Sequence, residues 1–177
     1  ILDGIYEPDE EHIAPAVIQA HLLQKLVDDL RLLTLAETGH LPIAAQDVYL
    51  DEIAGQTSVL FEAEALDKNI TLTVDTAPDL PPVTADPQRV GQVVSNLLSN
   101  ALRHVPDGGH INVTVQRQGE SVALSVADSG AGVPEADLPH LFDRFWRAEK
   151  SRNRLSGGAG LGLAIVKQLV LGMNGRI

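Results

Sequence analysis

The sequence predicts an α+β fold: a two-layer α/β sandwich with helices on one face of a mixed sheet, preceded by a long amphipathic helix. Three observations support this prediction. Leucines recur at three- and four-residue steps before residue 37, apolar and polar residues alternate at 70–74, 111–115 and 122–126, and helical patterns separate these runs. Elements mixed in this order favour helices packed against one side of a sheet.

The composition of the chain limits the partners that we expect. Of the 177 residues, 44% are hydrophobic but only 3% are aromatic, so the core is predicted to be aliphatic. A formal net charge of −11 argues against nucleic acid and anionic lipid as partners. The chain has no cysteine, which excludes disulfides and thiolate metal sites. No apolar run approaches the roughly 20 residues that a membrane-spanning helix needs.

The first predicted element is a helix from about Pro8 to Glu37. Acidic residues at 9–11 suit the positive end of a helix dipole, and Gly39 followed by Pro42 ends the helix. Its apolar seam consists of Ala16, Leu23, Leu26, Leu30 and Leu33, flanked by Leu22 and Val27. So apolar a face needs a partner, and we therefore expect one arm of a helical hairpin or bundle rather than a helix packed on its own domain.

A second helix is predicted from Asp47, which would cap it, to about Leu66. Its inward face is expected to consist of Leu50, Ile53, Leu60 and Ala63. The alternating run at 70–74 then predicts a half-buried strand, and the prolines at 78–82 predict a loop.

A third helix begins at Asp86 and Pro87, because a carboxylate can cap the first turn and proline fits its first position. It is predicted to end near His104. The two later alternating runs form a hairpin through the turn at 118–120. A glycine-rich loop, a short helix near residue 138, a polar stretch at 148–156 and a last helix over 160–173 complete the predicted order.

Three polar residues, Asn96, Asn100 and Arg103, lie on one face of the third helix, inside an otherwise apolar segment. Amide oxygens suit a hard cation such as Mg²⁺, and arginine suits a phosphate. Buried polar groups are also commonly satisfied by local hydrogen bonds. The spacing alone therefore leaves a binding role and a structural role equally open.

Asp128-Ser-Gly130-Ala-Gly132 follows the second strand of the hairpin. A carboxylate accepts hydrogen bonds and so suits an exocyclic amine such as that of adenine, for roughly 1.5–3 kcal/mol. The glycines would let a ligand approach the backbone. Taken alone, this motif is more typical of a tight turn.

The last helix opens with a run of glycines, Gly157-Gly-Ala-Gly-Leu-Gly162. Backbone amides at a helix start can bind an anion. The run is not a Walker loop, because no Gly-Lys-Ser/Thr follows, and it is not a dinucleotide fingerprint, because no parallel strand leads into it. On its own it is weak evidence for a phosphate site.

Together, these features resemble the ATP-binding domain of sensor histidine kinases, a branch of the gyrase, Hsp90, histidine kinase and MutL superfamily. The residues that carry the resemblance are Asp86–His104 for the N box, Asp128–Gly132 for G1, Leu141–Arg147 for the F box and Gly158–Leu163 for G2. The resemblance implies a Bergerat-type ATP-binding fold, with ATP and Mg²⁺ as ligands.

The resemblance also implies two domains. Residues 27–37 resemble the second helix of the dimerisation and histidine-phosphotransfer hairpin. We therefore expect a partial phosphotransfer segment at 1–41 and a catalytic ATP-binding domain at 42–177. None of the six histidines has the family's acceptor pattern, so the acceptor helix is expected before Ile1, and the family's closing strands are expected beyond residue 175.

The resemblance implies a role for each matching residue on the phosphate side. Asn100 would hold Mg²⁺ between the phosphates, with Asn96 close by. Arg103, which stands where the family usually has Lys, would meet a phosphate, and so would Arg147. The glycine-rich helix start would offer amides and hinge a lid over 148–156. The residues implied there are Lys150, Gly158, Gly160, Leu161, Gly162 and Leu163.

On the adenine side, the resemblance implies that Asp128 binds the exocyclic amine, and that Gly130 and Gly132 shape the pocket. His104 stands where an aromatic residue is usual in the family and would pack against the ribose. Relatives that hydrolyse ATP carry a glutamate four residues before the metal-binding Asn, where it activates water. Here that position is Asn96, an amide that cannot act as a base, which favours transfer to a protein over hydrolysis.

The predicted activity is transfer of the ATP γ-phosphoryl group to a histidine on a dimerisation helix outside this chain, and onward to an aspartate of a response-regulator receiver domain. The expected partners are ATP, the acceptor helix, a dimer mate and that receiver domain. A cytoplasmic location is expected, with the whole protein anchored in a membrane through upstream segments. The alternatives are an anti-sigma-type serine kinase of the same fold and a regulatory ATP-binding module.

Overall fold

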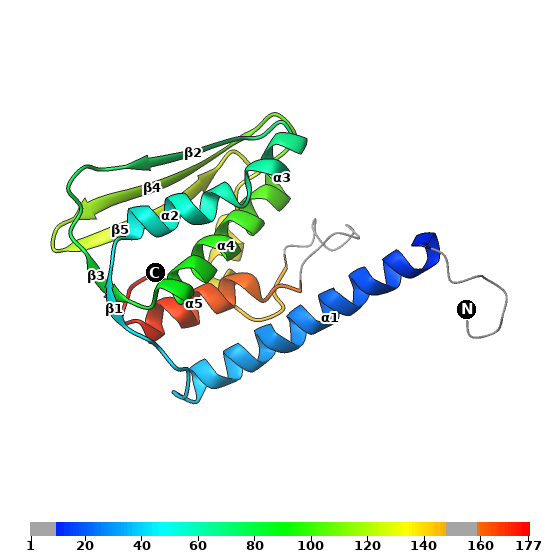
Figure 1. Cartoon of the computed structure of the whole chain (residues 1–177), viewed down its shortest axis with the longest axis horizontal. Helices are drawn as coiled ribbons and strands as arrows, with labels where there is room; N and C mark the ends of the chain where they lie inside the picture. Colours follow the sequence, from blue (N-terminus) through cyan, green and yellow to red (C-terminus); the bar gives the residue numbers. More distant parts are fainter. Residues whose placement is uncertain (1–9, 148–158) are drawn as a thin grey trace.

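The computed structural model describes residues 10–147 and 159–177. Helix α1 (Glu10–Glu37) extends along the outside of an α/β body and approaches it near its own C-terminal end (Figure 1). No helix within these two ranges is both long enough and apolar enough to cross a membrane.

Three strands form the main sheet in the order β2 (Thr71–Thr76), β4 (His110–Gln118), β5 (Ser121–Asp128). Strand β2 runs parallel to β4, and β4 runs antiparallel to β5, so the sheet is mixed, as the sequence predicts. Alternate residues of β4, namely Ile111, Val113 and Val115, are fully buried and define the inner face of the sheet.

Helices α2 (Leu50–Val59), α3 (Glu62–Asp67) and α4 (Pro87–His104) lie on one side of this sheet (Figure 1). The apolar face of α4 contributes Val94, Leu98, Ala101 and Leu102 to the same core cluster as the inner face of β4. Residues spaced by three and four along α4 thus point towards the sheet, and the polar residues between them point away from it. The predicted two-layer α+β fold is confirmed.

A second core cluster joins α1 to the body. Helix α5 (Gly162–Gly172) buries Ile165 and Leu169, together with Leu161 just before it, against Leu32 and Leu33 of α1. Side chains from α4 complete this cluster, so α5 lies between the long helix and the sandwich. The short 3-10 helix η1 (Glu135–His140) precedes it in the chain, near the predicted residue 138.

The predicted second helix differs from the structure in its start, in its end and in part of its inward face. Asp47 does not cap it but pairs with Thr84 in a small antiparallel sheet of β1 (Gln46–Val48) and β3 (Val83–Ala85), which the sequence reading missed. The helix ends at Val59, because the N–H groups of residues 60 and 61 bond three residues back, to the carbonyls of Thr57 and Ser58.

The predicted inward face is right before this break and wrong after it, since Leu50 and Ile53 are half-buried and pack against the core. Leu60 is 77% exposed and Ala63 is exposed, whereas Ala54 and Ala65 are buried. A single continuous helix would have kept one phase through residue 66. The tighter turn at the break rotates the second segment, and different residues then face the sheet.

Only part of the predicted seam of α1 is buried. Leu33 is buried and Leu26 is half-buried, but Leu23 is 63% exposed and Leu30 is 41% exposed. The exposed apolar face of α1 consists of Ile13, Val17, Leu23, Val27 and Leu30, and Ile18 and Leu22 are exposed on the opposite side of the helix. That this face has a partner stays a prediction.

Candidate functional site

Helix α4 carries the first group of candidate residues, and Asp86 fixes where this helix begins. One oxygen of Asp86 accepts hydrogen bonds from the N–H groups of Gln88 (2.9 Å) and Arg89 (3.3 Å), and the other accepts from Ala44 (2.9 Å). Burial alone would raise the pKa of this carboxyl, but the three backbone donors and the charge of Arg89 together lower it below its ordinary value. The charged cap therefore fixes both the helix and the segment that leads into it.

Asn96 and Asn100 lie one turn apart on α4 and are both half-buried. A methyl group placed on Gly162 would lie 3.7 Å from the amide oxygen of Asn96. This side of α4 therefore faces the first residue of α5, and backbone amides at a helix start can bind an anion. The structure brings the predicted N and G2 segments together.

The loop after β5 lies against the C-terminal end of α4. The Asp128 carboxylate accepts a hydrogen bond from the N–H of Gly130 at 2.8 Å, which fixes its orientation. A methyl group at Gly130 would lie 2.6 Å from that carboxylate oxygen and 3.1 Å from the carbonyl oxygen of His104. Only glycine allows the loop to approach the helix so closely. This approach places Asp128 next to the end of the N segment.

Ser129 is a residue of this loop to which the sequence reading gave no role. Its hydroxyl accepts a hydrogen bond from the N–H of His110 at 2.8 Å, and its own N–H donates to the carbonyl of His110 at 3.0 Å. A serine directly after a strand is a known local signal for such side-chain-to-backbone bonds. Ser129 thereby continues the β4–β5 pairing to the point where the loop turns towards α4.

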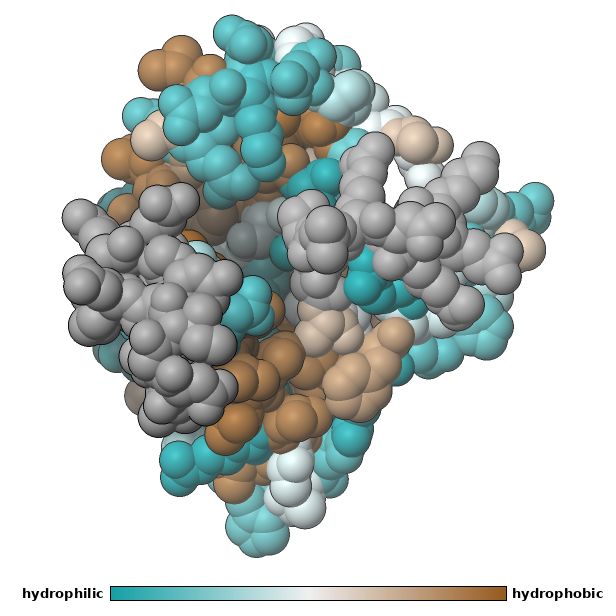
Figure 2. Space-filling view, turned by 90° about the vertical axis from the view of Figure 1, so that its right-hand side faces the viewer, coloured by the Kyte–Doolittle hydropathy of each residue, from teal (hydrophilic) through white to brown (hydrophobic). Residues whose placement is uncertain are grey.

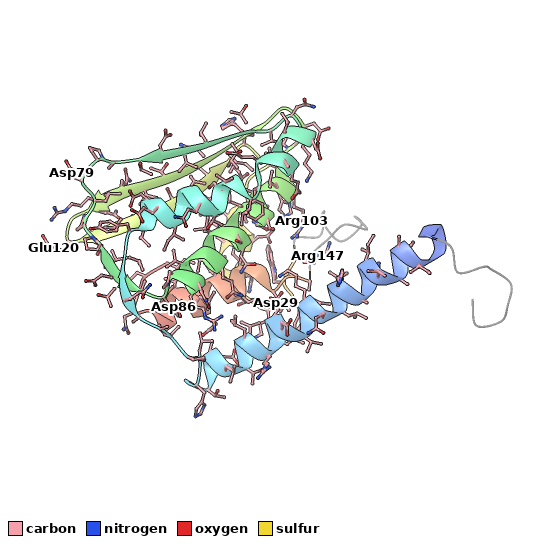
Figure 3. The ribbon with its side chains drawn as sticks, in the orientation of Figure 1. Asp29, Asp79, Asp86, Arg103, Glu120 and Arg147 are labelled. Carbon is pink, nitrogen blue, oxygen red and sulfur yellow. The ribbon has the colours of Figure 1, made fainter. Side chains whose placement is uncertain are left out.

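Arg103 and Arg147 bring two positive charges to the same side of the molecule from distant parts of the chain (Figure 3). Partial burial lowers the pKa of Arg103, and the nearby charge of Arg147 lowers it further, while Glu64 acts in the opposite direction. Arginine stays protonated at neutral pH despite such shifts. Two positive charges that act on each other favour binding of an anion nearby.

The segment that carries Arg147 is attached to the start of α5. The N–H of Phe145 donates to the carbonyl of Gly160 at 3.0 Å, and Lys167 lies over the Phe142 ring at 5.7 Å from its centre. Gly160 has φ +72°, and a methyl group there would lie 2.7 Å from the carbonyl oxygen of Trp146. The F and G2 segments therefore meet through a glycine that no larger residue can replace without strain.

The remaining candidate residues are less closely placed. Gly132 has φ +68° and is exposed, and nothing lies near the position of its missing side chain. Leu161 belongs to the core cluster with α1, and Leu163 is half-buried. Lys150, Gly158 and the predicted lid at 148–156 lie outside the described residues.

This side of the molecule is recessed. Figure 2 shows a hollow near the centre of the face, with hydrophilic side chains above it and a band of hydrophobic ones below. A separate cleft of about 250 Å³ between α1 and α4 is lined by Arg89, Gln92 and Leu35, among others. That cleft lies about two to three turns of α4 away from Asn100 and contains none of the candidate residues.

Comparison with known proteins identifies the family. Residues 85–177, just over half of the chain, match the family model described as histidine kinase-, DNA gyrase B-, and HSP90-like ATPase. The chain belongs to this ATPase family. The matched range includes α4, the Asp128 loop and the glycine-rich start of α5, so the family's ATP-binding domain accounts for all four segments that the fold brings together.

The chain is also similar to individual histidine kinases. The chain is 37% identical over 177 residues to the signal transduction histidine-protein kinase BaeS of Escherichia coli K12, and spans 38% of that protein's length. It resembles full-length ShkA in complex with AMPPNP (TM-score 0.80, 25% identity, 97% of this chain and 36% of that one). It also resembles histidine kinase ThkA in complex with the response regulator protein TrrA (TM-score 0.64, 25% identity, 81% and 42%).

These findings confirm the suspected family and the ATP-binding character of the domain. The individual roles of the candidate residues stay predictions. Within residues 10–147 and 159–177, no group of three or more His, Cys, Asp or Glu side chains is placed to hold a metal ion.

Proposed function

We propose that this chain is the kinase domain of a sensor histidine kinase, which binds ATP with Mg²⁺ and transfers the γ-phosphoryl group to a histidine on a dimerisation helix. The observation that carries the proposal is the convergence of four sequence segments on one side of α4. Asn96 faces Gly162, Gly130 contacts His104, and the charge of Arg147 acts on Arg103. A fold that only needed stability would not require two glycine contacts and two neighbouring arginines at one place.

In this proposal, Asp128 recognises adenine. One of its oxygens is held by the N–H of Gly130, and the other can accept the exocyclic amine. Gly130 and Gly132 leave room for the base, and His104 packs against the ribose. Because the carboxylate is oriented before the nucleotide arrives, little ordering is needed on binding.

The phosphates would lie between α4 and the start of α5. Arg103 and Arg147 would supply positive charge that the protein as a whole, at −11, does not offer. The amides of Gly160, Leu161, Gly162 and Leu163 would add donors at the helix start. For Lys150 and Gly158, the same phosphate-binding role is proposed by resemblance alone.

Asn100 and Asn96 fit a magnesium ion, because both are half-buried amides on the face of α4 that meets α5, and hard cations prefer oxygen ligands. When bound, Mg²⁺ would supply positive charge that neutralises the phosphates. Asn96 cannot take a proton from water, so hydrolysis is disfavoured. The remaining task is to hold ATP in line with an incoming imidazole nitrogen, which mainly needs positioning and charge neutralisation.

The two-domain reading and the partners are part of the same proposal. Residues 1–41 would belong to the dimerisation and phosphotransfer hairpin, and residues 42–177 to the kinase domain. The exposed apolar face of α1 would contact the acceptor helix and a dimer mate, and a receiver domain would accept the phosphoryl group, as the ThkA–TrrA complex suggests by analogy. We propose a cytoplasmic location for this domain. The histidine-kinase relatives favour this reading over a serine kinase.

Calorimetric titration of the chain with ATP–Mg²⁺ tests the proposal. Asp128→Asn should weaken binding by roughly 10- to 150-fold, because about 1.5–3 kcal/mol is lost with a charge-assisted hydrogen bond. Asp79→Asn is the matched control, since Asp79 is exposed in a loop far from the site and has a φ of +54°, which asparagine tolerates (Figure 3). Unchanged affinity in the Asp128 variant would refute the adenine assignment.

Transfer is tested separately, with labelled ATP and a purified acceptor hairpin from a histidine kinase relative. We expect acid-labile, base-stable label on the hairpin and none on the chain itself. Label on one of the six histidines of this chain would contradict the expectation that the acceptor lies elsewhere.

A further inference from the structure

We infer that Glu37 and Arg144 form a joint through which the long helix α1 positions the segment 141–147, and with it Arg147 at the phosphate side of the site. The inference rests on the proposed function. It gives these two residues a positioning role, since neither is placed to touch the nucleotide. The geometry that supports it has three parts.

The first part is the contact itself. The guanidinium of Arg144 forms an ion pair with the carboxylate of Glu37, in the last turn of α1. Both side chains are about two-fifths exposed, so water and salt reach the pair. Its strength is therefore that of a surface ion pair, which adds little to the stability of the fold. Its role in this inference is to hold the segment in position.

The second part is the way in which the segment is held. On one side it is attached to α5, through the Phe145–Gly160 hydrogen bond and the contact of Lys167 with the Phe142 ring. On the other side it is attached to α1 through Arg144. Because a short segment with attachments on two sides has a defined orientation, loss of one attachment frees the residues that follow, including Arg147.

The third part is the rigidity of the end of α1. Leu33 is 1% exposed and packs with Leu161, Ile165 and Leu169 of the α5 cluster. Glu37 follows Leu33 by one helical turn, and its backbone position is therefore fixed relative to α5. Earlier turns of α1 are largely exposed, so a force on the long helix reaches the segment 141–147 through this last turn.

The joint predicts an effect that simple electrostatics does not. Glu37→Gln removes a negative charge beside Arg144, and by long-range attraction alone it should strengthen ATP binding. If Glu37 instead positions the segment, the same variant should weaken ATP binding, by about two- to fivefold for the loss of a surface ion pair. The two explanations therefore predict opposite changes in the ATP affinity of this variant.

The test has a readout that needs no nucleotide, because Trp146 is the only tryptophan of the chain and lies two residues from Arg144. Emission maximum and acrylamide quenching of Trp146 would be measured for Glu37→Gln, Arg144→Gln and the charge swap Glu37→Arg/Arg144→Glu. Lys25→Gln is the matched control, because it breaks another ion pair of α1, with Asp29 at 3.1 Å, away from the segment. Circular dichroism melts would verify that each variant folds.

We expect both single variants to increase quenching of Trp146 and to weaken ATP–Mg²⁺ binding, and the swap to restore both within about twofold. The differences should fade near 1 M NaCl, where the Debye length is about 3 Å. Folded single variants with unchanged Trp146 quenching would overturn the joint. Altered quenching with unchanged or tighter ATP binding would overturn its positioning role. If the unaltered chain bound no ATP, the proposed function would fail, and the fluorescence would still decide whether the joint exists.

Discussion

Replacing Asp86 by alanine removes one carboxylate that serves two parts of the molecule. Its side chain is 5% exposed and accepts three backbone hydrogen bonds, two from the first turn of α4 and one from Ala44 in the segment between α1 and β1. Alanine leaves all three donors without this acceptor. We therefore expect both the start of α4 and the path of the chain around Ala44 to be weakened.

The magnitude follows from these bonds. Loss of a helix N-cap to alanine costs about 1 kcal/mol, and up to about 2. Loss of the charge-assisted bond to Ala44 adds about 1.5–3 kcal/mol. The sum is about 2.5–5 kcal/mol of unfolding free energy. Asp86→Asn should cost roughly half as much, because asparagine caps helices nearly as well as aspartate but loses the charge and one acceptor oxygen.

Urea denaturation followed by circular dichroism measures these changes. We expect a lower midpoint with an unchanged slope for Asp86→Ala, and an intermediate midpoint for Asp86→Asn. Glu120→Ala is a matched control for the loss of an exposed carboxylate in a turn, and Glu120 has no positive φ that alanine would strain. A free energy of unfolding for Asp86→Ala within about 0.5 kcal/mol of this control would show that the three hydrogen bonds do not act as a cap.

Four further predictions follow. Since the pKa of Asp86 is lowered in the folded state, its stabilisation is complete above the ordinary value of 3.8 and is lost as the pH falls through the folded value; below pH 5 the urea midpoint of the unaltered chain should therefore fall more steeply than that of Asp86→Asn. Leu33→Ala should cost about 2–5 kcal/mol in the same assay, because Leu33 is buried between α1 and α5. Gly160→Ala should cost about 1–3 kcal/mol through backbone strain, seen as a lower melting temperature. Arg103→Gln should weaken ATP binding by about tenfold in calorimetry while leaving adenosine binding unchanged.

The parts of the fold that the sequence predicted correctly have local causes. Asp86 and Pro87 mark a helix start whatever the rest of the chain does, and the apolar spacing of α4 fixes which of its faces is buried. The alternation at 111–115 and 122–126 likewise predicts two strands, and the glycine at residue 119 joins them. Because these signals lie within single elements, they survive without knowledge of the tertiary structure.

The errors arise where a long-range pairing, or a turn that no residue type marks, decides the outcome. Strands β1 and β3 have three residues each and exist because Gln46 pairs with Ala85, a partner far along the chain. The end of α2 depends on two short-range hydrogen bonds, and no proline or glycine marks this turn in the sequence. A continuous helical phase through this break predicts a buried Leu60, which is exposed.

In the candidate site, individual residues can be recognised in the sequence, but their proximity depends on the fold. Arg103 could be singled out from its position on α4, but its proximity to Arg147 depends on a contact between Phe145 and Gly160 that no periodicity predicts. An acidic protein that binds an anion needs positive charge to be concentrated locally, since its overall field is repulsive. The fold supplies this concentration by bringing the end of α4 to the segment before α5. The electrostatic character of the site is therefore a property of how the elements pack, although each contributing residue can be read from the sequence.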